Sequence, residues 1–179
     1  LLEHREREGF PDHVALLGVR GAGKSTVGAE VARRMDRPFV ELDQRIEEEA
    51  GLSLGQIFSI HGEPYYRQLE HDVLRRVLSE RQPLVVATGG SLVTHHESWA
   101  LLRQRARTIW LRADAQQHWD RVIAQGDRRP MGRNPQAFNQ LEALLREREP
   151  LYLQASSEVE TSRRSIEQVV GDVLARATG

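Results

Sequence analysis

The sequence has 179 residues, no cysteine, 28% charged residues and a formal net charge of −1. This length suits one domain with a substantial core, and the balanced charge gives no reason to expect direct binding of nucleic acid or of an anionic membrane. The absence of cysteine excludes disulfides, thiolate metal sites and a cysteine nucleophile, and it is compatible with the cytoplasmic location that we expect. No apolar run approaches the roughly 20 residues of a membrane span.

The first twelve residues are rich in charge and end in Gly9-Phe10-Pro11 and Asp12. They have little to bury, and we expect residues 1–12 to be a tail or a linker. Because the first residue is Leu1 rather than Met, we also expect the chain to be a piece of a longer protein. Residues 13–179 are then predicted to form the single domain.

Short apolar runs alternate with helical patterns through that domain. Helical periodicity is clear in residues 65–79 and 137–148, and Ser165 opens the last helix with a capping box. Such alternation predicts a three-layer α/β/α domain with a parallel sheet. Five strands are expected, at residues 14–17, 39–42, 84–88, 108–111 and 158–161.

The first strand runs into Gly18-Val19-Arg20-Gly21-Ala22-Gly23-Lys24-Ser25, which fits the phosphate-loop pattern G-x-x-x-x-G-K-[ST] between a strand and a helix. Backbone N–H groups and the helix dipole would bind phosphates there, Lys24 would neutralise the outer phosphates, and Ser25 would ligate Mg²⁺. Of the 25 Lys and Arg residues, only Lys24 is lysine, as expected where a planar guanidinium could not replace a compact ammonium. The expected nucleotide-binding residues of this loop are Gly18, Gly21, Ala22, Gly23, Lys24, Ser25 and Thr26.

In parallel sheets, ligands bind beyond the carboxyl ends of the strands. Glu41 and Asp43 follow the second strand, and period-two geometry would place both carboxylates on one side, beside the phosphate loop. Gly89 and Gly90 follow the third strand and would let backbone N–H groups approach a ligand closely. By themselves, such acids are more often helix caps, and a Gly-Gly pair is usually a turn.

Several arginines are further candidates. The irregular stretch 126–135 carries Arg129 and is predicted to be a lid, with a surface loop as the alternative. Arg67 and Arg148, judged alone, are surface ion-pair partners. Arg164 lies either near a nucleotide base or on the polar surface before the last helix.

Taken together, the motifs resemble the shikimate kinase family of phosphate-loop proteins, from about residue 14 to residue 177. Besides the phosphate loop, the resemblance depends on the ordered motifs Phe39-x-Glu41-x-Asp43, Gly62-Glu63-x-x-Tyr66-Arg67-x-x-Glu70, Thr88-Gly89-Gly90, Arg129-Pro130-Met131 and Arg148-Glu149-Pro150-Leu151-Tyr152. It implies transfer of the ATP γ-phosphoryl group to the 3-hydroxyl of shikimate, with Mg²⁺.

The resemblance also implies a role for each site residue. Asp43 would orient or deprotonate the attacking hydroxyl, and Gly89 and Gly90 would bind the substrate through backbone N–H groups. Arg67 and Arg148 would pair with the shikimate carboxylate. Among the residues at the phosphates, Lys24 would hold the β- and γ-phosphates, Ser25 and Glu41 would serve Mg²⁺, and Arg129 would close over the transferring group.

Three positions depart from the family pattern. Glu41 replaces the first acid of a D-x-D motif, Ser91 replaces a third glycine and would be strained if that position needs positive φ, and Arg121 is offset by one residue from the arginine that stacks on adenine. Glu41-Leu42-Asp43, the run Val122-Ile123-Ala124-Gln125-Gly126-Asp127 before Arg129, and the charged segment ahead of the first strand resemble the shikimate-kinase-like effector domain of benzoyl-CoA-responsive transcriptional regulators. In those regulators the domain lies downstream of a helix-turn-helix DNA-binding domain. Two hypotheses therefore stand: an ATP-dependent shikimate kinase, or a domain that senses an aromatic acyl-CoA with little or no turnover.

Overall fold

The computed structural model describes residues 12–124 and 136–179. The predicted tail, apart from Asp12, and the whole of the predicted lid, including Arg129, lie outside the described residues. The described elements are, in order, β1 (His13–Leu17), α1 (Lys24–Arg34), β2 (Phe39–Glu41), α2 (Leu42–Ala50), α3 (Leu54–His61), α4 (Glu63–Val77), β3 (Val85–Ala87), the short 3₁₀ helix η1 (Leu92–Thr94), α5 (His96–Arg105), β4 (Ala106–Arg112), α6 (Ala115–Ala124), α7 (Ala137–Tyr152), β5 (Ser157–Glu160) and α8 (Ile166–Thr178).

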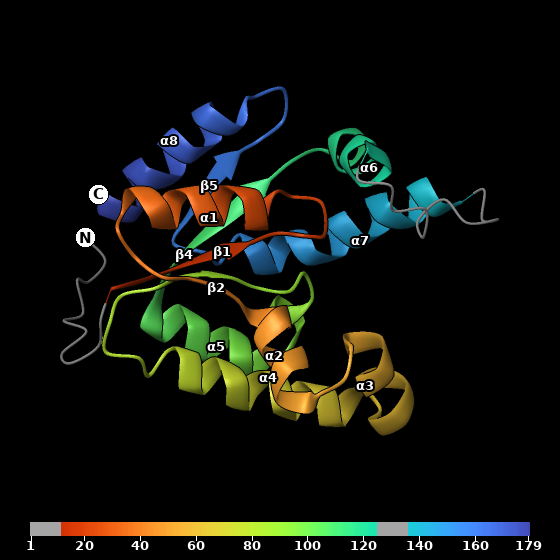
Figure 1. Cartoon of the computed structure of the whole chain (residues 1–179). Coiled ribbons are helices and arrows are strands. Elements are labelled where there is room, and N and C mark those ends of the chain that lie inside the picture. Colours follow the sequence, from red (N-terminus) through yellow and green to blue (C-terminus); the bar gives the residue numbers. More distant parts are fainter. Residues whose placement is uncertain (1–11, 125–135) are drawn as a thin grey trace.

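The five strands form one parallel sheet in the order β2-β3-β1-β4-β5 (Figure 1). All five predicted strands are confirmed to within a few residues, and so is the parallel sheet. Strand β1 lies at the centre, and all five of its side chains are buried because helices cover both faces of the sheet. The loop that follows β1 therefore leaves the middle of the sheet at its carboxyl edge.

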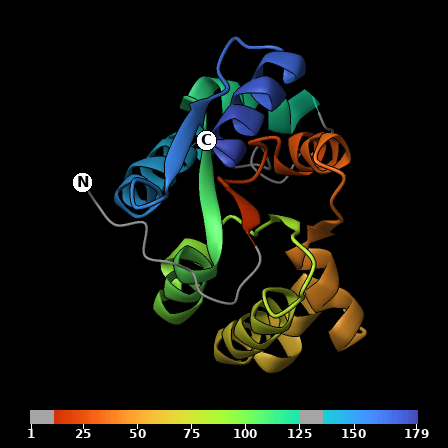
Figure 2. The ribbon, with the colours of Figure 1, turned by 90° about the vertical axis from the view of Figure 1, so that its left-hand side faces the viewer.

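Helices cover both faces of the sheet (Figures 1 and 2). Helices α1 and α8 pack on one face over Leu16, Ile109 and neighbouring apolar residues, and helices α4, α5 and α7 pack on the other face around Leu17, Trp110 and Tyr152. The predicted three-layer arrangement is thus confirmed. In the part of the chain that the structure describes, no helix is both long and apolar enough to cross a membrane.

Two local predictions need correction. Strand β2 ends at Glu41 and helix α2 begins at Leu42, so Asp43 lies in the first turn of a helix rather than on an extended strand. The period-two argument for Glu41 and Asp43 was therefore wrong, although both residues do lie beside the phosphate loop. Ser91 adopts φ −101° and ψ −1°, a conformation open to any residue, so serine carries no backbone strain here.

Candidate active site

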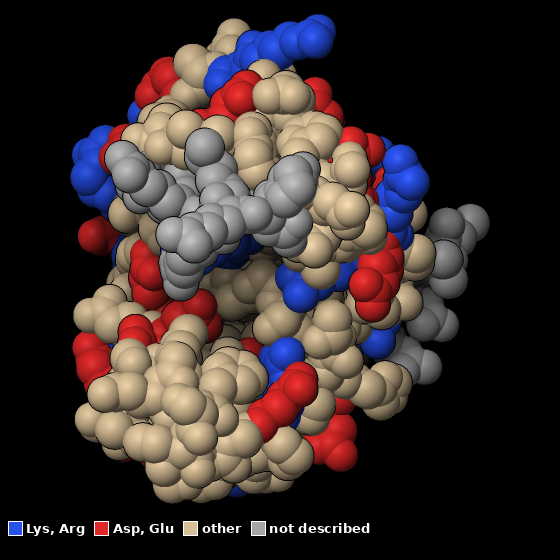
Figure 3. All heavy atoms as spheres, turned by 90° about the vertical axis from the view of Figure 1, so that its right-hand side faces the viewer, with Lys and Arg blue, Asp and Glu red and all other residues tan. Residues whose placement is uncertain are grey.

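A cavity of about 330 Å³ opens at the carboxyl edge of the sheet, where β1, β2 and β3 end. Figure 3 shows this face, where a hollow is bordered by both basic and acidic side chains. Three segments that are distant in the sequence line the cavity: residues 20–26 of the phosphate loop, Glu41 and Asp43, and residues 87–90 after β3. The structure therefore brings together the loop, the two acids and the Gly-Gly pair that the sequence singled out.

The phosphate loop has the backbone geometry that its glycines allow. Gly18 has φ +149°, and a Cβ there would stand 2.9 Å from both the Leu111 carbonyl oxygen and the Ala22 Cβ, so only glycine fits. Gly23 has φ +94° and is the N-cap of α1. As a result the loop turns tightly into the N-terminus of α1, where free N–H groups and the helix dipole favour phosphate.

Lys24 lies partly buried beneath this loop. Its ammonium donates hydrogen bonds to the carbonyl oxygens of Gly18 and Val19. Burial lowers the pKa of Lys24 to about 8, against the opposing influence of the Asp43 and Glu41 carboxylates. Lys24 is therefore a desolvated cation that gains much from an anion placed in the cavity.

Asp43 faces Lys24 across the cavity. Its Oδ1 atom is buried and has no hydrogen-bond partner among the described residues. The same oxygen would lie only 2.8 Å from a Cβ on Gly89, so the carboxylate sits directly against the glycine pair. Burial raises the pKa of Asp43, and nearby Lys24 opposes that rise. An orphaned acceptor in such a place is suited to a ligand hydroxyl.

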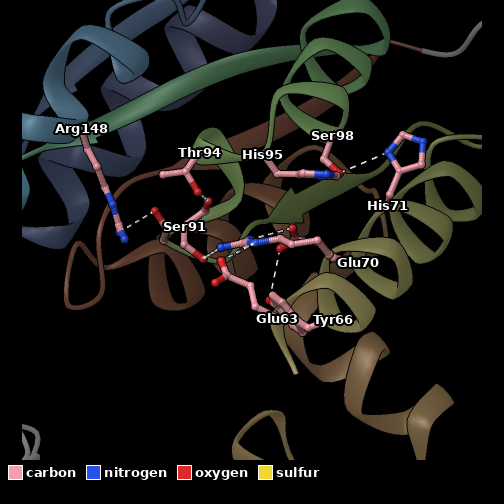
Figure 4. Close-up of polar contacts among 11 residues, drawn as sticks. Glu63, Tyr66, Glu70, His71, Ser91, Thr94, His95, Ser98 and Arg148 are labelled. Atoms are coloured by element: carbon pink, nitrogen blue, oxygen red, sulfur yellow. Dashed lines mark hydrogen bonds and ion pairs between the residues drawn. The ribbon is translucent and has the colours of Figure 1, made fainter. Parts of the chain in front are cut away.

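Arg67 lies on α4 in a network of paired side chains. Figure 4 labels four other members of this network: Glu63, Tyr66, Glu70 and Ser91. Its Nη1 donates to Glu70 Oε1 at 2.9 Å, its Nη2 donates to Ser91 Oγ at 3.0 Å, and its Nε lies 3.6 Å from Glu63 Oε1. Glu70 is fully buried and also accepts a hydrogen bond from the Tyr66 hydroxyl. Arg67 is therefore a fixed, mostly buried guanidinium rather than the surface partner that its sequence position alone suggests.

Arg148 on α7 reaches the same loop from the other side. Its Nη1 donates to the Gly90 carbonyl oxygen at 2.9 Å, and the Tyr152 hydroxyl donates to that oxygen at 2.7 Å. The two predicted carboxylate-binding arginines thus contact consecutive residues, Gly90 and Ser91, at the edge of the cavity. They come from helices far apart in the sequence, and the loop after β3 joins them.

Two predicted nucleotide residues lie away from the cavity lining. Arg121 donates from Nη1 to Thr161 Oγ1 at 3.0 Å and from Nη2 to the Thr161 carbonyl oxygen at 2.9 Å, which ties α6 to the end of β5. Arg164 pairs with Asp172 of α8. Neither residue is among those that line the cavity, so their roles at the nucleotide base stay predictions.

Sequence reasoning gave no role to two residues that hold the site together. Glu70 follows Arg67 by one helical turn, a spacing at which an acid and a base meet, and this spacing could have identified it. Tyr152 lies one turn after Arg148 on α7 and stacks on Trp110. No local signal indicates that its hydroxyl reaches Gly90.

The residues present fit a magnesium ion. The Ser25 hydroxyl and the carboxylates of Glu41 and Asp43 line the same cavity, and one Asp43 oxygen has no described partner. Hydroxyl and carboxylate oxygens are the ligands that Mg²⁺ prefers when it is also bound to phosphates. No cluster of three or more histidines and acids that could hold a metal by protein ligands alone occurs among the described residues.

A partly buried lysine under a glycine loop, a helix N-terminus aimed at a cavity and a carboxylate facing that lysine are typical of phosphate-loop phosphotransferases. The model of the shikimate kinase family matches residues 20–178. The chain therefore belongs to the shikimate kinase family, and it is an ATP-dependent small-molecule kinase that works with Mg²⁺.

Individual relatives agree with the family assignment. The chain is 40% identical over 161 residues to a shikimate kinase of Nitrobacter winogradskyi, covering 90% of this chain and 74% of the relative. It is 41% identical over 146 residues to a shikimate kinase of Synechococcus sp., covering 82% and 76%. Among solved structures, shikimate kinase from Acinetobacter baumannii in complex with shikimate superposes with a TM-score of 0.81 at 30% identity, covering 93% of this chain and 92% of the other.

Proposed function

We propose that this chain transfers the γ-phosphoryl group of ATP to the 3-hydroxyl of shikimate. The observation that carries the proposal is the buried Asp43 Oδ1, which has no described partner and lies in the same cavity as Lys24. A carboxylate oxygen of this kind accepts a hydrogen bond from a hydroxyl and takes its proton as the hydroxyl attacks. The raised pKa of Asp43 suits that task.

On the nucleotide side, the residues would bind the phosphates of ATP and the Mg²⁺ ion. The N–H groups of residues 21–26 and the Lys24 ammonium would hold the phosphates. Ser25 and Glu41 would hold Mg²⁺, which neutralises charge on the phosphoryl oxygens when it is bound. Glu41 lines the cavity together with Ser25 and Asp43, which supports this role for the longer glutamate side chain.

On the acceptor side, two guanidinium groups would hold a carboxylate. Arg67 and Arg148 are each fixed by a partner on the loop after β3, and each keeps further N–H donors. A guanidinium binds a carboxylate through two parallel hydrogen bonds, which fixes the orientation of the acid. The N–H groups of Gly89 and Gly90 would bind the substrate next to Asp43, which directs one ring hydroxyl to the phosphate side.

Three further arginines keep predicted roles. Arg129 is expected to close over the transferring phosphoryl group, and it lies outside the described residues. Arg121 and Arg164 are expected near the nucleotide base; Arg121 is held at the end of β5 and Arg164 at α8.

The test is a coupled ADP-release assay with Mg-ATP and shikimate. Lys24→Ala and Asp43→Asn are each expected to lower kcat by about 100-fold or more, because each removes a charge that acts on the transferring group. Arg33→Ala is a matched control, since Arg33 pairs only with Glu30 in the described contacts and lies at the exposed end of α1. Full activity in either site variant would contradict the proposal.

A second proposal concerns an effector. The similarity of Glu41 and the loop before Arg129 to a regulator's effector domain supports binding of an aromatic acyl-CoA, whose phosphates would use the same loop, and a fused upstream DNA-binding domain. Calorimetry with benzoyl-CoA tests this: binding that ATP competes away supports it, and no binding at millimolar concentration rejects it. A cytoplasmic location stays a prediction.

A further inference from the structure

Ser91 carries the one hydroxyl group that contacts the Arg67 guanidinium among the described residues. Figure 4 shows it between Glu63, Glu70 and Arg148, at the start of η1. Its Oγ accepts a hydrogen bond from Arg67 Nη2 at 3.0 Å. A hydroxyl that accepts a bond still has its own proton to donate, so Ser91 keeps a donor beside the guanidinium.

The backbone that carries this hydroxyl is held on both sides. The Ser91 carbonyl oxygen accepts hydrogen bonds from the Thr94 N–H at 3.0 Å and from the Thr94 hydroxyl at 2.6 Å. On the other side, the preceding residue Gly90 is held by Arg148 and Tyr152. Because the loop backbone is held by these hydrogen bonds, we expect Ser91 to orient the Arg67 side chain rather than to move with it.

The contacts of Arg67 divide between two elements. Glu63 and Glu70 belong to α4 itself and fix the guanidinium relative to its own helix. Ser91 belongs to the loop whose preceding residues, Gly89 and Gly90, line the cavity. Among the described contacts, the Ser91 hydroxyl is thus the one that joins the Arg67 guanidinium to the loop at the edge of the cavity.

We propose that Ser91 is a positioning and specificity-determining residue for the acceptor carboxylate, an inference that rests on the function proposed above. Its hydroxyl holds Nη2 of Arg67 so that the remaining N–H groups face the acid, and its proton is a further donor to a carboxylate oxygen. Two guanidinium groups and one hydroxyl then surround the acid. This arrangement favours a carboxylate over an ester or amide, because an uncharged group leaves the two cations without an anion.

Removing only the hydroxyl tests the proposal. Ser91 has ordinary backbone angles and is only partly buried, so Ser91→Ala and Ser91→Thr both fit. Ser91→Ala is expected to raise KM for shikimate about fivefold to tenfold, the effect of losing one hydrogen bond in a charged site, and to leave kcat and KM for ATP within about twofold. Ser91→Thr, which keeps the hydroxyl, restores KM. An equal change of kcat and of both KM values would indicate a merely structural role and overturn the proposal.

Two comparisons separate the alternatives. With shikimate methyl ester as acceptor, Ser91→Ala is expected to change KM by less than about twofold, because the charged oxygen pair is absent. In an Arg67→Ala background, the effect of Ser91→Ala on KM is expected to be at least about twofold smaller than in the unmodified chain, because only the direct bond from the hydroxyl to the acid is then left to lose. Full additivity, or an equal effect on acid and ester, would overturn the proposal.

A variant elsewhere in the loop tests whether loop stability alone explains the effect, and the unmodified chain tests the proposed function itself. Thr94→Val removes a hydrogen bond to the same loop without touching Arg67, and it is expected to leave KM for shikimate within about twofold. A rise equal to that of Ser91→Ala would assign the effect to loop stability and overturn the proposal. If the unmodified chain fails to phosphorylate shikimate, the proposed function fails; if it turns over and ignores Ser91, only the present inference fails.

Discussion

The two proposed halves of the candidate active site, one for the nucleotide and one for the acceptor, achieve charge complementarity in different ways. The nucleotide half consists mainly of backbone, with the N–H groups of residues 21–26 and a single ammonium, Lys24. The acceptor half consists of side chains from α2, α4 and α7, and its cations are paired with Glu70, Ser91 and the Gly90 carbonyl oxygen. A backbone site tolerates many side chains, whereas a side-chain site depends on each pairing.

The difference also concerns what changes when ligands bind. Lys24 donates to two carbonyl oxygens of its own loop and must exchange them for phosphate oxygens. Arg67 and Arg148 can keep their partners while their other N–H groups take the acid, because a guanidinium has five donors. The nucleotide half should therefore respond to the protonation of one group, and the acceptor half should be preorganised and insensitive to pH near neutrality.

Among variants that keep every charged group of the site, the largest expected effect comes from Gly89, where the two halves meet. A Cβ at Gly89 would lie 2.8 Å from Asp43 Oδ1, so Gly89→Ala must displace the carboxylate to which we assign the attacking hydroxyl. A misplacement of about 1 Å at the reacting centre can lower turnover about 100-fold, and we expect a loss of this order in kcat. Steady-state kinetics with both substrates measures it, with KM for ATP expected to change by less than about threefold.

The neighbouring glycine gives the comparison variant. A Cβ at Gly90 would lie 3.4 Å from its nearest neighbours, the Arg20 amide nitrogen and the Val19 Cα, which is ordinary contact. Gly90→Ala is therefore expected to lower kcat by only about tenfold, against about 100-fold for Gly89→Ala. Equal losses would mean that the loop itself, and not Asp43, is displaced.

Much of the nucleotide half could be predicted from sequence because its signals are local. The strand, the glycines, Lys24 and Ser25 are consecutive, so the loop and the parallel sheet that carries it followed from pattern alone. Glu41 and Asp43 were also placed correctly beside the loop, but by a wrong argument. The chain passes directly from strand β2 into helix α2. No sequence signal at Leu42 indicates that the strand ends and the helix begins there.

The acceptor half was much less accessible, because its geometry depends on contacts between distant segments. Arg67 and Ser91 are 24 positions apart, and Gly90 and Arg148 are 58 apart. Without the family resemblance, Arg67 and Arg148 were most simply surface residues. Strain at Ser91 was expected only if the residue needed a positive φ. Its φ is negative, so this condition is not met, and the sequence alone could not show it.

The next largest effect, a change of about tenfold in the affinity for Mg-ATP, tests whether the nucleotide half responds to pH more strongly than the acceptor half. Burial lowers the pKa of Lys24 to about 8, so the ammonium is charged at pH 7 and mostly neutral at pH 9. Because the charged form binds phosphate, the affinity for Mg-ATP is expected to fall about tenfold from pH 7 to pH 9. Calorimetric titration at the two pH values measures it.

Lys24→Met serves as the control for that titration, because it removes the titrating group. Its affinity for Mg-ATP is expected to be low at both pH values and to differ between them by less than about twofold. Shikimate binding to the unmodified chain should also stay within about twofold, since guanidinium groups keep their charge throughout this range. A nucleotide affinity that is constant from pH 7 to pH 9 would show that the pKa of Lys24 lies outside this range.

The smallest effect concerns Tyr152, whose hydroxyl shares the Gly90 carbonyl oxygen with Arg148. In Tyr152→Phe the ring keeps its stacking on Trp110 at 5.3 Å, and Gly90 keeps the bond from Arg148. Only one hydrogen bond is lost and no acceptor is left empty, so we expect a loss of about 1 kcal/mol in unfolding free energy and about a twofold rise in KM for shikimate. Urea unfolding and steady-state kinetics measure the two quantities, with Tyr65→Phe at an exposed position as the control. A KM rise of tenfold or more would mean that Tyr152 positions Arg148 as well as the loop, and the acceptor half would then depend on its aromatic core as much as on its ion pairs.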